Sequence, residues 1–179
     1  RNITAKFRRA ADALAGEQRQ HGGRVAVAEL PGTKNFQLAT EHGFQPGDIK
    51  TAMNGAALII VTLPDEMQAK VYSEQIAPIL VAGQTLGFCH GFNIHFKYIV
   101  PPKNVNVIMV APKGPGHLVR AQYLKGEGVP ALIAVHQDPS GKSKDVALAY
   151  AGAIGAARAG VIETTFTEET ETDLFGEQA

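Results

Sequence analysis

The chain has 179 residues, of which 45% are hydrophobic and 19% are charged. This composition is typical of a globular domain with a single core, and it excludes disordered and fibrous chains. Seventeen basic residues balance seventeen acidic ones, so the formal net charge is zero. Because a neutral chain lacks the positive charge with which proteins hold nucleic acid or anionic membranes, the composition favours chemistry on small molecules.

Cysteine content and hydropathy indicate the setting in which the protein works. The single Cys89 cannot form an internal disulfide, and the chain does not open with the pattern of a secretory signal. The longest apolar runs, 56–62 and 131–135, are far shorter than the roughly 20 residues that span a bilayer. We therefore expect a soluble, cytoplasmic protein.

Short apolar runs alternate with helix-like segments along the chain. The runs are continuous rather than alternating in polarity, which is typical of strands buried on both faces of a parallel sheet. The predicted strands are 24–28, 57–62, 85–89, 105–110, 131–136 and 160–165, and the predicted helices are 34–42, 65–80, 117–125 and 142–158. This order predicts a doubly wound α/β domain with a mainly parallel sheet and helices on both faces.

Two helix starts carry local signals. Pro64 precedes Asp65 and Glu66, and both a fixed φ angle and negative charge suit a helix N-terminus. Thr165 and Glu168 have the spacing of a capping box, which predicts that a last helix begins there and runs through the tail.

The tail is acidic, with five Glu and one Asp in the last seventeen positions. On a helix Glu169, Asp173 and Glu177 lie at i, i+4 and i+8, so they share one side and repel one another. A divalent cation such as magnesium, which takes oxygen ligands, is one means of neutralising them. A solvated acidic face is the ordinary alternative.

Polar residues follow the predicted strands, where ligands of doubly wound domains lie. His90 and Gly91 come directly after the third strand; a histidine there can relay a proton, and the glycine allows close approach. Lys113 follows the fourth strand in a loop of prolines and glycines, suited to holding a carboxylate or phosphate. Asp138 follows the fifth strand and is more typical of a turn. The alternative for each of these residues is a side chain without a functional role, hydrogen-bonded within the protein or exposed to solvent.

A dinucleotide site should have a glycine-rich turn between its first strand and helix. Gly126-x-Gly128-x-x-Ala131 matches the letters but precedes a strand, so we interpret it as a loop. Near the N-terminus, residues 2–7 have the pattern of a short alternating strand. Arg8 and Arg9 would then begin a helix running to about Gln20, as phosphate ligands or as part of a solvated basic helix.

The segment 29–35 occupies the position that contacts the adenosine ribose in such domains. Thr33, Lys34 and Asn35 offer donors for a 2′-phosphate, whereas Glu29 favours an unmodified ribose. A plain Pro-Gly turn is the alternative interpretation.

The strand-end segments occur in a distinctive order. They are Leu63-Pro-Asp-Glu66, His90-Gly-Phe-Asn-Ile-His95, 110–117, 128–138, 158–166 and 169–178. In these segments the chain resembles the N-terminal domain of ketol-acid reductoisomerase in its short bacterial form, from about Arg24 to the end. The resemblance implies a Rossmann-type domain, residues 24–179, that binds NADPH and contributes part of a two-magnesium site. The family rearranges 2-acetolactate or 2-aceto-2-hydroxybutyrate by alkyl migration and then reduces the ketone.

The resemblance also assigns roles to individual residues. His90 and Lys113 match catalytic residues, and Asp173 and Glu177 match magnesium ligands, which leaves Glu169 as an ordinary surface carboxylate. The positions expected along the cofactor are Thr33, Asn35, Leu63, Pro64, Asp65, Gln68 and Gly91.

Three departures from the family matter. Its first strand and glycine-rich turn have no counterpart before Arg24, so residues 1–23 are an atypical N-terminal segment. Leu30 stands where short-loop members commonly have Arg, which weakens the preference for NADPH and leaves NADH possible. The family's all-helical C-terminal domain, which supplies further metal ligands, would follow residue 179, so we expect the isolated chain to be inactive.

We expect a homo-oligomer in the full enzyme, with no nucleic acid or membrane partner. Two alternatives remain. One is a non-catalytic Rossmann module that has lost its pyrophosphate turn, and the other is a different NAD(P)-dependent dehydrogenase.

Overall fold

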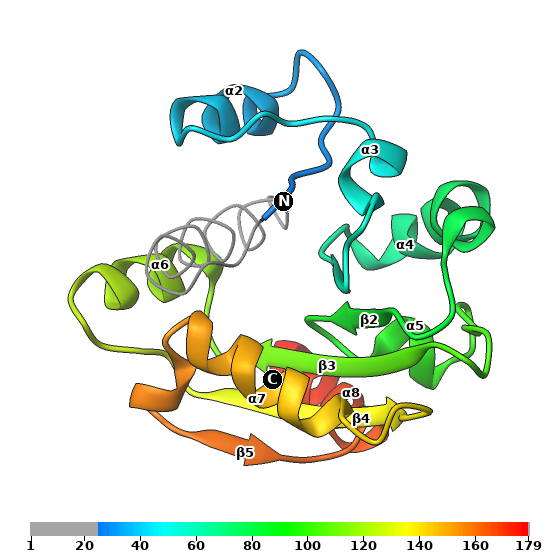
Figure 1. Cartoon of the computed structure of the whole chain (residues 1–179). Coiled ribbons are helices and arrows are strands. Elements are labelled where there is room, and N and C mark those ends of the chain that lie inside the picture. Colours follow the sequence, from blue (N-terminus) through cyan, green and yellow to red (C-terminus); the bar gives the residue numbers. More distant parts are fainter. Residues whose placement is uncertain (1–24, 179) are drawn as a thin grey trace.

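The computed structural model describes residues 25–178, with side chains through Gly176. A five-stranded sheet forms its centre, with the strands in sequence order (Figure 1). The strands are β1 (Leu58–Val61), β2 (Thr85–Phe88), β3 (Asn106–Pro112), β4 (Ala131–Gln137) and β5 (Val161–Glu163). The predicted strands from residue 57 onward are therefore all present, each with both ends within two residues of the predicted ones.

The sheet is mainly parallel, as the continuous apolar runs predict. β1 pairs with β2 and β2 with β3 in parallel, with Gly87 opposite Ile60 and Ile108. β4 is the exception, because it runs antiparallel to β3, with a register shift between Val107 and Ile108. β5 runs parallel to β4. The carboxyl ends of β2 and β3 thus lie at one edge of the sheet, and the residues that follow them are neighbours.

Helices cover both faces of the sheet, which confirms the predicted layers. Successive residues of β3 point to opposite faces. Val107 and Met109 join one buried cluster, whereas Ile108 and Val110 join another with Tyr150. The helices are α2 (Lys34–Glu41), α3 (Ile49–Met53), α4 (Asp65–Val71), α5 (Phe92–His95), α6 (Gly116–Leu124), α7 (Ser143–Ala153) and α8 (Phe166–Gln178).

Two predicted helices are shorter than expected. In the segment 65–80, α4 passes into a π-helical turn (Tyr72–Ile76) and then a 3-10 turn (Ala77–Ile79). Pro78 has no N–H to donate to the helical ladder, which favours an end there. In the segment 142–158, α7 ends at Ala153. Gly155 has φ of +86°, and a 3-10 turn (Ala156–Arg158) follows. Both α3 and α5 were missed because they are only a turn long.

The predicted strand 24–28 is wrong as a member of the sheet. Within the described residues this segment makes only an isolated parallel bridge, between Ala28 and Gly47. β1 is the last strand on its side of the described sheet. Residues 2–20, with their predicted strand and helix, lie outside the described residues.

The predicted helix starts are confirmed. α4 begins at Asp65 directly after Pro64, with Asp65 and Glu66 in its first turn. α8 begins at Phe166, and the Thr165 hydroxyl accepts from the backbone N–H of Glu168 at 3.0 Å. The Gly126–Ala131 segment connects α6 to β4, as its position before a strand predicts. In the part of the chain that the structure describes, no helix is both long and apolar enough to cross a membrane.

Gly128 fixes how closely the α6–β4 loop packs. A Cβ atom at this position would lie 2.0 Å from the carbonyl oxygen of Gly155, a backbone atom that cannot turn aside. We expect Gly128→Ala to lower the free energy of unfolding by about 1–3 kcal/mol, measured by urea denaturation.

Gly152 provides the matched control, because it lies in α7 and a Cβ atom added there would meet nothing within 4 Å. Gly152→Ala should raise the free energy of unfolding by about 0.5–1 kcal/mol, since alanine costs less entropy in a helix. A Gly128→Ala protein as stable as the original would contradict the described packing.

Candidate active site

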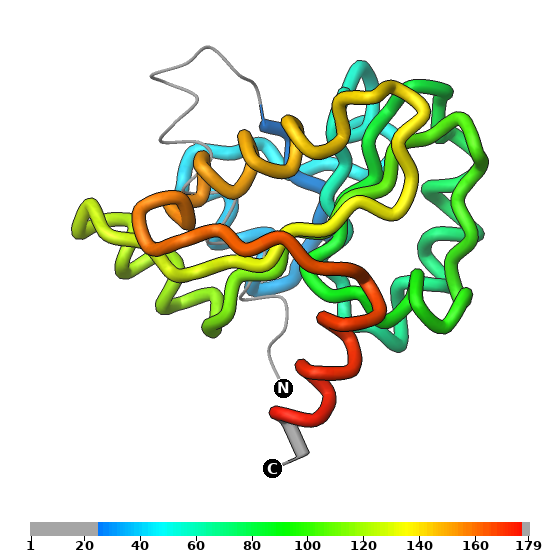
Figure 2. Tube along the Cα trace, turned by 90° about the horizontal axis from the view of Figure 1, so that it is seen from below, coloured from blue at the N-terminus to red at the C-terminus, as the bar shows by residue number. Residues whose placement is uncertain are grey.

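The candidate active site forms where the strand ends meet the last helix. His90 lies two residues after β2, and Lys113 directly follows β3. The chain then leaves β5 and enters α8, which packs against α5 (Figure 2). Glu169 and Asp173 lie one turn apart on α8, so both project toward the strand ends.

The carboxylate of Glu169 is the centre of this cluster. One oxygen, Oε2, lies 3.0 Å from Nδ1 of His90 and accepts from the backbone N–H of Gly91 at 2.9 Å. The other oxygen, Oε1, accepts from Nζ of Lys113 at 2.8 Å. Residues from two separate connections, β2–α5 and β3–α6, therefore converge on one side chain of α8.

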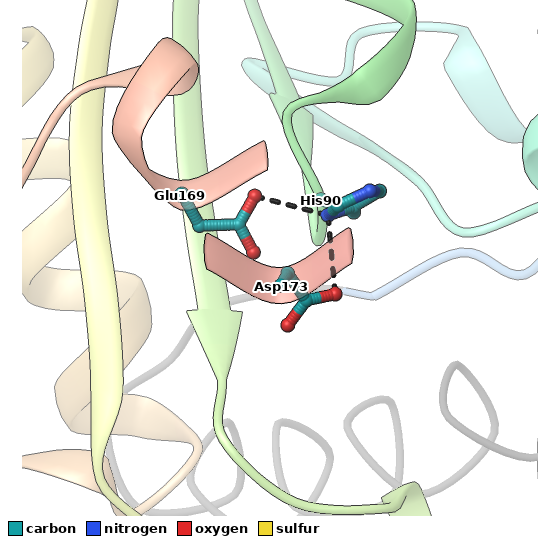
Figure 3. A group of neighbouring side chains, drawn as sticks. All are labelled: His90, Glu169 and Asp173. Atoms are coloured by element: carbon teal, nitrogen blue, oxygen red, sulfur yellow. Dashed lines mark hydrogen bonds and ion pairs between the residues drawn. The ribbon is translucent and has the colours of Figure 1, made fainter. Parts of the chain in front are cut away.

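Asp173 lies on the open side of the same cluster. Its Oδ1 accepts from Nζ of Lys113 at 2.8 Å, and its Oδ2 lies 3.4 Å from Nδ1 of His90. Figure 3 shows both carboxylates turned toward the imidazole ring. The side chain of Asp173 is 29% exposed, whereas that of Glu169 is 1% exposed. Asp173 is thus the carboxylate that an incoming ligand can reach.

The expectation that Glu169 is a surface carboxylate is wrong. α8 approaches the β2–α5 turn so closely that a Cβ atom at Gly91 would lie 2.4 Å from the Thr170 hydroxyl oxygen and 2.6 Å from the Phe166 carbonyl oxygen. This approach buries Glu169 between the helix and the strand ends. Its i, i+4 spacing to Asp173 was the signal in the sequence, since both carboxylates had to share a side of the helix.

The charged groups shift one another's pKa values. Burial raises the pKa of Glu169, but hydrogen bonds from His90 and Lys113 outweigh it, so the net pKa is lowered. For His90 and Lys113 burial lowers the pKa. Hydrogen bonds and the nearby carboxylate charges outweigh that effect and raise both values. The cluster therefore favours an ionised Glu169 beside protonated His90 and Lys113.

These shifts define a pH window for the cluster. The lowered pKa of Glu169 contributes stability that is lost as the pH falls through its folded-state pKa. The raised pKa of His90 contributes stability that is lost as the pH rises through its folded-state pKa. The His90–Glu169 interaction is thus strongest between these two values.

A second polar cluster lies beside the first. Nε2 of Gln68 donates to the Leu63 carbonyl at 2.8 Å and to Oδ1 of Asp65 at 3.0 Å. Nδ2 of the buried Asn93 lies 3.1 Å from the Asp65 carbonyl oxygen and 3.2 Å from Oε1 of Gln68. Burial raises the pKa of Asp65, and the charge of His90 partly offsets it. Asn93, which sequence reasoning missed, ties the β1–α4 loop to α5.

The residues expected along the cofactor lie in two separate regions of the structure. Leu63 and Pro64 connect β1 to α4, and Asp65 begins α4, close enough to His90 for their charges to interact. Thr33 and Asn35 lie at the start of α2, which Figure 1 shows far from α5 and α8. The Thr33 hydroxyl caps α2, accepting from the Phe36 N–H at 3.1 Å and donating to the Leu30 carbonyl at 2.9 Å.

Gln68 and Gly91 are engaged within the protein. Gln68 is 5% exposed, and its amide holds the β1–α4 loop. The Gly91 N–H is bonded to Glu169. Their contacts place them behind the site, as supports for the residues at its surface, and contact with a cofactor stays a prediction for both.

The donor set fits a hard cation only in part. Among the described residues, His90, Glu169 and Asp173 offer ligand atoms within 4.8 Å of one another. Both oxygens of Glu169 are already occupied by internal donors, so it is a poor ligand. Asp173 is exposed and supplies oxygen, the atom that magnesium prefers. Glu177 lies one turn further along α8, and its side chain is outside the described residues.

A mainly parallel α/β sheet with a charged cluster beyond its strand ends is the arrangement of the Rossmann-like class of nucleotide-binding domains. The family follows from sequence. Residues 9–160 match the family of acetohydroxy acid isomeroreductase, NADPH-binding domain. The chain belongs to this family, and the match begins before the described residues.

Solved structures agree with this assignment. The chain is 47% identical to an NADH-preferring ketol-acid reductoisomerase from an uncultured archaeon, with a TM-score of 0.86 over 93% of this chain and 52% of that one. The chain thus spans about half the length of this relative. An NAD-binding semialdehyde dehydrogenase protein from Cupriavidus necator, in complex with calcium and NAD, shares the fold at 20% identity, a TM-score of 0.70 and coverages of 88% and 59%.

The Glu169–His90 contact predicts a change that NMR can measure. In Glu169→Gln the anionic partner of His90 is removed while burial remains, so the pKa of His90 should fall below its value in the unmodified chain. Titrating the imidazole resonances in a metal-free buffer measures this shift.

Glu168→Gln is the matched control, because Glu168 is exposed on α8 and bonded to the Thr164 hydroxyl. It should leave the pKa of His90 unchanged. Equal behaviour of the two variants would show that Glu169 does not hold the imidazole.

Proposed function

We propose that the chain is the cofactor domain of an NADPH- and Mg²⁺-dependent ketol-acid reductoisomerase of branched-chain amino-acid biosynthesis, acting in the cytoplasm. The substrate is 2-acetolactate or 2-aceto-2-hydroxybutyrate, and the product is the 2,3-dihydroxy acid. One observation carries the proposal: two cationic groups and two carboxylates converge beyond β2 and β3 in a chain of this family.

His90 handles a proton in this proposal. Because both of its neighbours are carboxylates that accept hydrogen bonds, Nδ1 carries hydrogen. The bond to Glu169 fixes the ring, leaving Nε2 to face the reaction. The raised pKa of His90 keeps it protonated to higher pH, so it can donate to the oxygen of the ketone as hydride arrives.

Lys113 supplies a fixed positive charge. Its raised pKa keeps it an ammonium, with two of its three hydrogens directed at Glu169 and Asp173. The third is left for a substrate oxygen, where it stabilises negative charge that develops during the rearrangement.

Asp173 and Glu177 would hold magnesium as oxygen ligands one helical turn apart. When bound, magnesium polarises the carbonyl of the substrate. Two carboxylates fill only part of its shell, so the proposal requires ligands from outside this chain. We assign these, and most of the substrate pocket, to a helical C-terminal domain within the remaining half of the longer relative's length. The full protein would be a homo-oligomer.

The cofactor is NADPH, with NADH also accepted. The family supports NADPH, whereas the similar archaeal enzyme prefers NADH. Leu30 is uncharged and 70% exposed where a positive side chain would contact a 2′-phosphate. The Glu29 carboxylate accepts from the Leu30 N–H at 3.0 Å, which keeps a negative charge at this turn. Both features favour an unmodified ribose.

Calorimetry tests cofactor and metal binding separately. NADPH and NADH should each bind the chain with a dissociation constant below about 1 mM, the upper end of ordinary substrate affinities. Asp173→Asn should weaken Mg²⁺ binding by at least about tenfold, the lower end of the typical loss for residues that only support metal ligands. It should leave the affinity for NADPH unchanged.

Glu171→Gln is the control, because Glu171 is exposed on the same helix. It should change neither affinity. Absence of binding at millimolar cofactor would support the non-catalytic module instead, and equal loss of metal and cofactor binding in Asp173→Asn would refute the metal assignment.

A further inference from the structure

Two buried amide side chains join the connections that follow β1 and β2. Asn93 is 2% exposed and lies three residues after His90, and Gln68 is 5% exposed in α4. Nδ2 of Asn93 donates to Oε1 of Gln68 at 3.2 Å, and Nε2 of Gln68 donates to the Leu63 carbonyl at 2.8 Å. Two hydrogen bonds therefore lead from the segment that carries His90 to the backbone of the β1–α4 loop.

The direction of these hydrogen bonds is fixed. The Leu63 carbonyl can only accept, and Oδ1 of Asp65 accepts from the same Nε2 atom at 3.0 Å, so the amide nitrogen of Gln68 must face them. Its oxygen is left to accept from Asn93. Nδ2 of Asn93 lies within 3.3 Å of three acceptors, namely Oε1 of Gln68 and the carbonyl and carboxylate oxygens of Asp65. Position 93 thus requires a donor, which asparagine supplies and an alkyl side chain does not.

The segment from His90 to Asn93 is also held by α8. Oε2 of Glu169 accepts from the Gly91 N–H at 2.9 Å and lies 3.0 Å from Nδ1 of His90. Two residues after Gly91, the Asn93 carbonyl accepts from the Ile99 N–H at 3.0 Å. The segment is therefore fixed to α8 at one end and to the β1–α4 loop at the other.

We propose that Asn93 is a positioning residue, which holds the β1–α4 loop, with the expected cofactor contacts of Leu63 and Pro64, in register with His90. The inference rests on the proposed function, because it requires a nicotinamide cofactor along this loop. Hydride transfer needs the cofactor and the proton donor placed together, and a misplacement of about 1 Å can cost about a hundredfold in rate. Asn93 acts through Gln68 and the backbone of the loop, as support for groups at the surface of the site.

A purely structural role is the alternative, because the loss of any buried hydrogen bond destabilises a protein. Asn106 provides the matched control. It is also 2% exposed, its Nδ2 donates to two backbone carbonyls at 3.2 and 3.4 Å, and its Oδ1 accepts from the Ser140 N–H. Asn106 begins β3, at the opposite end of that strand from Lys113. Asn93→Leu and Asn106→Leu thus each remove a buried amide, and only the first lies at the site.

Calorimetric titration of NADPH into the chain tests the inference, at a temperature where circular dichroism shows that each variant is folded. Asn93→Leu should weaken NADPH binding by about tenfold or more, the effect of one ordinary buried hydrogen bond, because the loop is no longer held in place. Asn106→Leu should bind NADPH as tightly as the unmodified chain, even though it also loses stability.

A second measurement needs no variant. In the unmodified chain, saturating NADPH should shift the side-chain amide NMR signals of Gln68 and Asn93 and leave those of Asn106 in place, because only the first two support the loop. Unshifted signals at Gln68 and Asn93, unchanged binding in Asn93→Leu, or equal weakening in the two variants would each overturn the inference alone. Failure of the unmodified chain to bind NADPH would overturn the proposed function together with it.

Discussion

The candidate site depends on the burial of one carboxylate. An ionised Glu169 that is 1% exposed would be very costly without partners, because a buried charge loses its hydration. Here three donors, from His90, Gly91 and Lys113, compensate for that loss. The same contacts join α8 to the ends of β2 and β3. The geometry of the ion pairs and the position of α8 therefore depend on each other.

This constraint explains why Asp173 stands where it does. Glu169 fixes the rotation of α8, and Asp173, one turn later, then meets Lys113 and His90 from the exposed side. The buried carboxylate positions the charges, and the exposed one remains within reach of a ligand. The side-chain amides of Gln68 and Asn93 likewise hold the carboxylate of Asp65. The site is thus supported by packed elements, which functional geometry requires.

Local sequence signals predicted much of this arrangement. The apolar runs predicted the strands from 57 onward, and the Thr165 cap predicted α8. The rule for strand ends singled out His90 and Lys113, whereas helical spacing and the family resemblance singled out Asp173. The burial of Glu169 was not predictable in this way, because its partners lie 56 to 79 residues away in the chain. Nor was the position of β1 at the end of the described sheet, because apolar runs do not encode strand order.

The central claim is that Glu169 and Lys113 stabilise each other at the hub of the site. A double-mutant cycle of Glu169→Gln and Lys113→Met, with unfolding followed in urea, measures that coupling directly. The structure predicts a favourable coupling of at least about 1 kcal/mol, since the 2.8 Å ion pair joins Lys113 to a carboxylate that is 1% exposed, and the partners that remain after a single change, His90 for Glu169 and Asp173 for Lys113, replace it only in part. Additive effects within about 0.5 kcal/mol would contradict it.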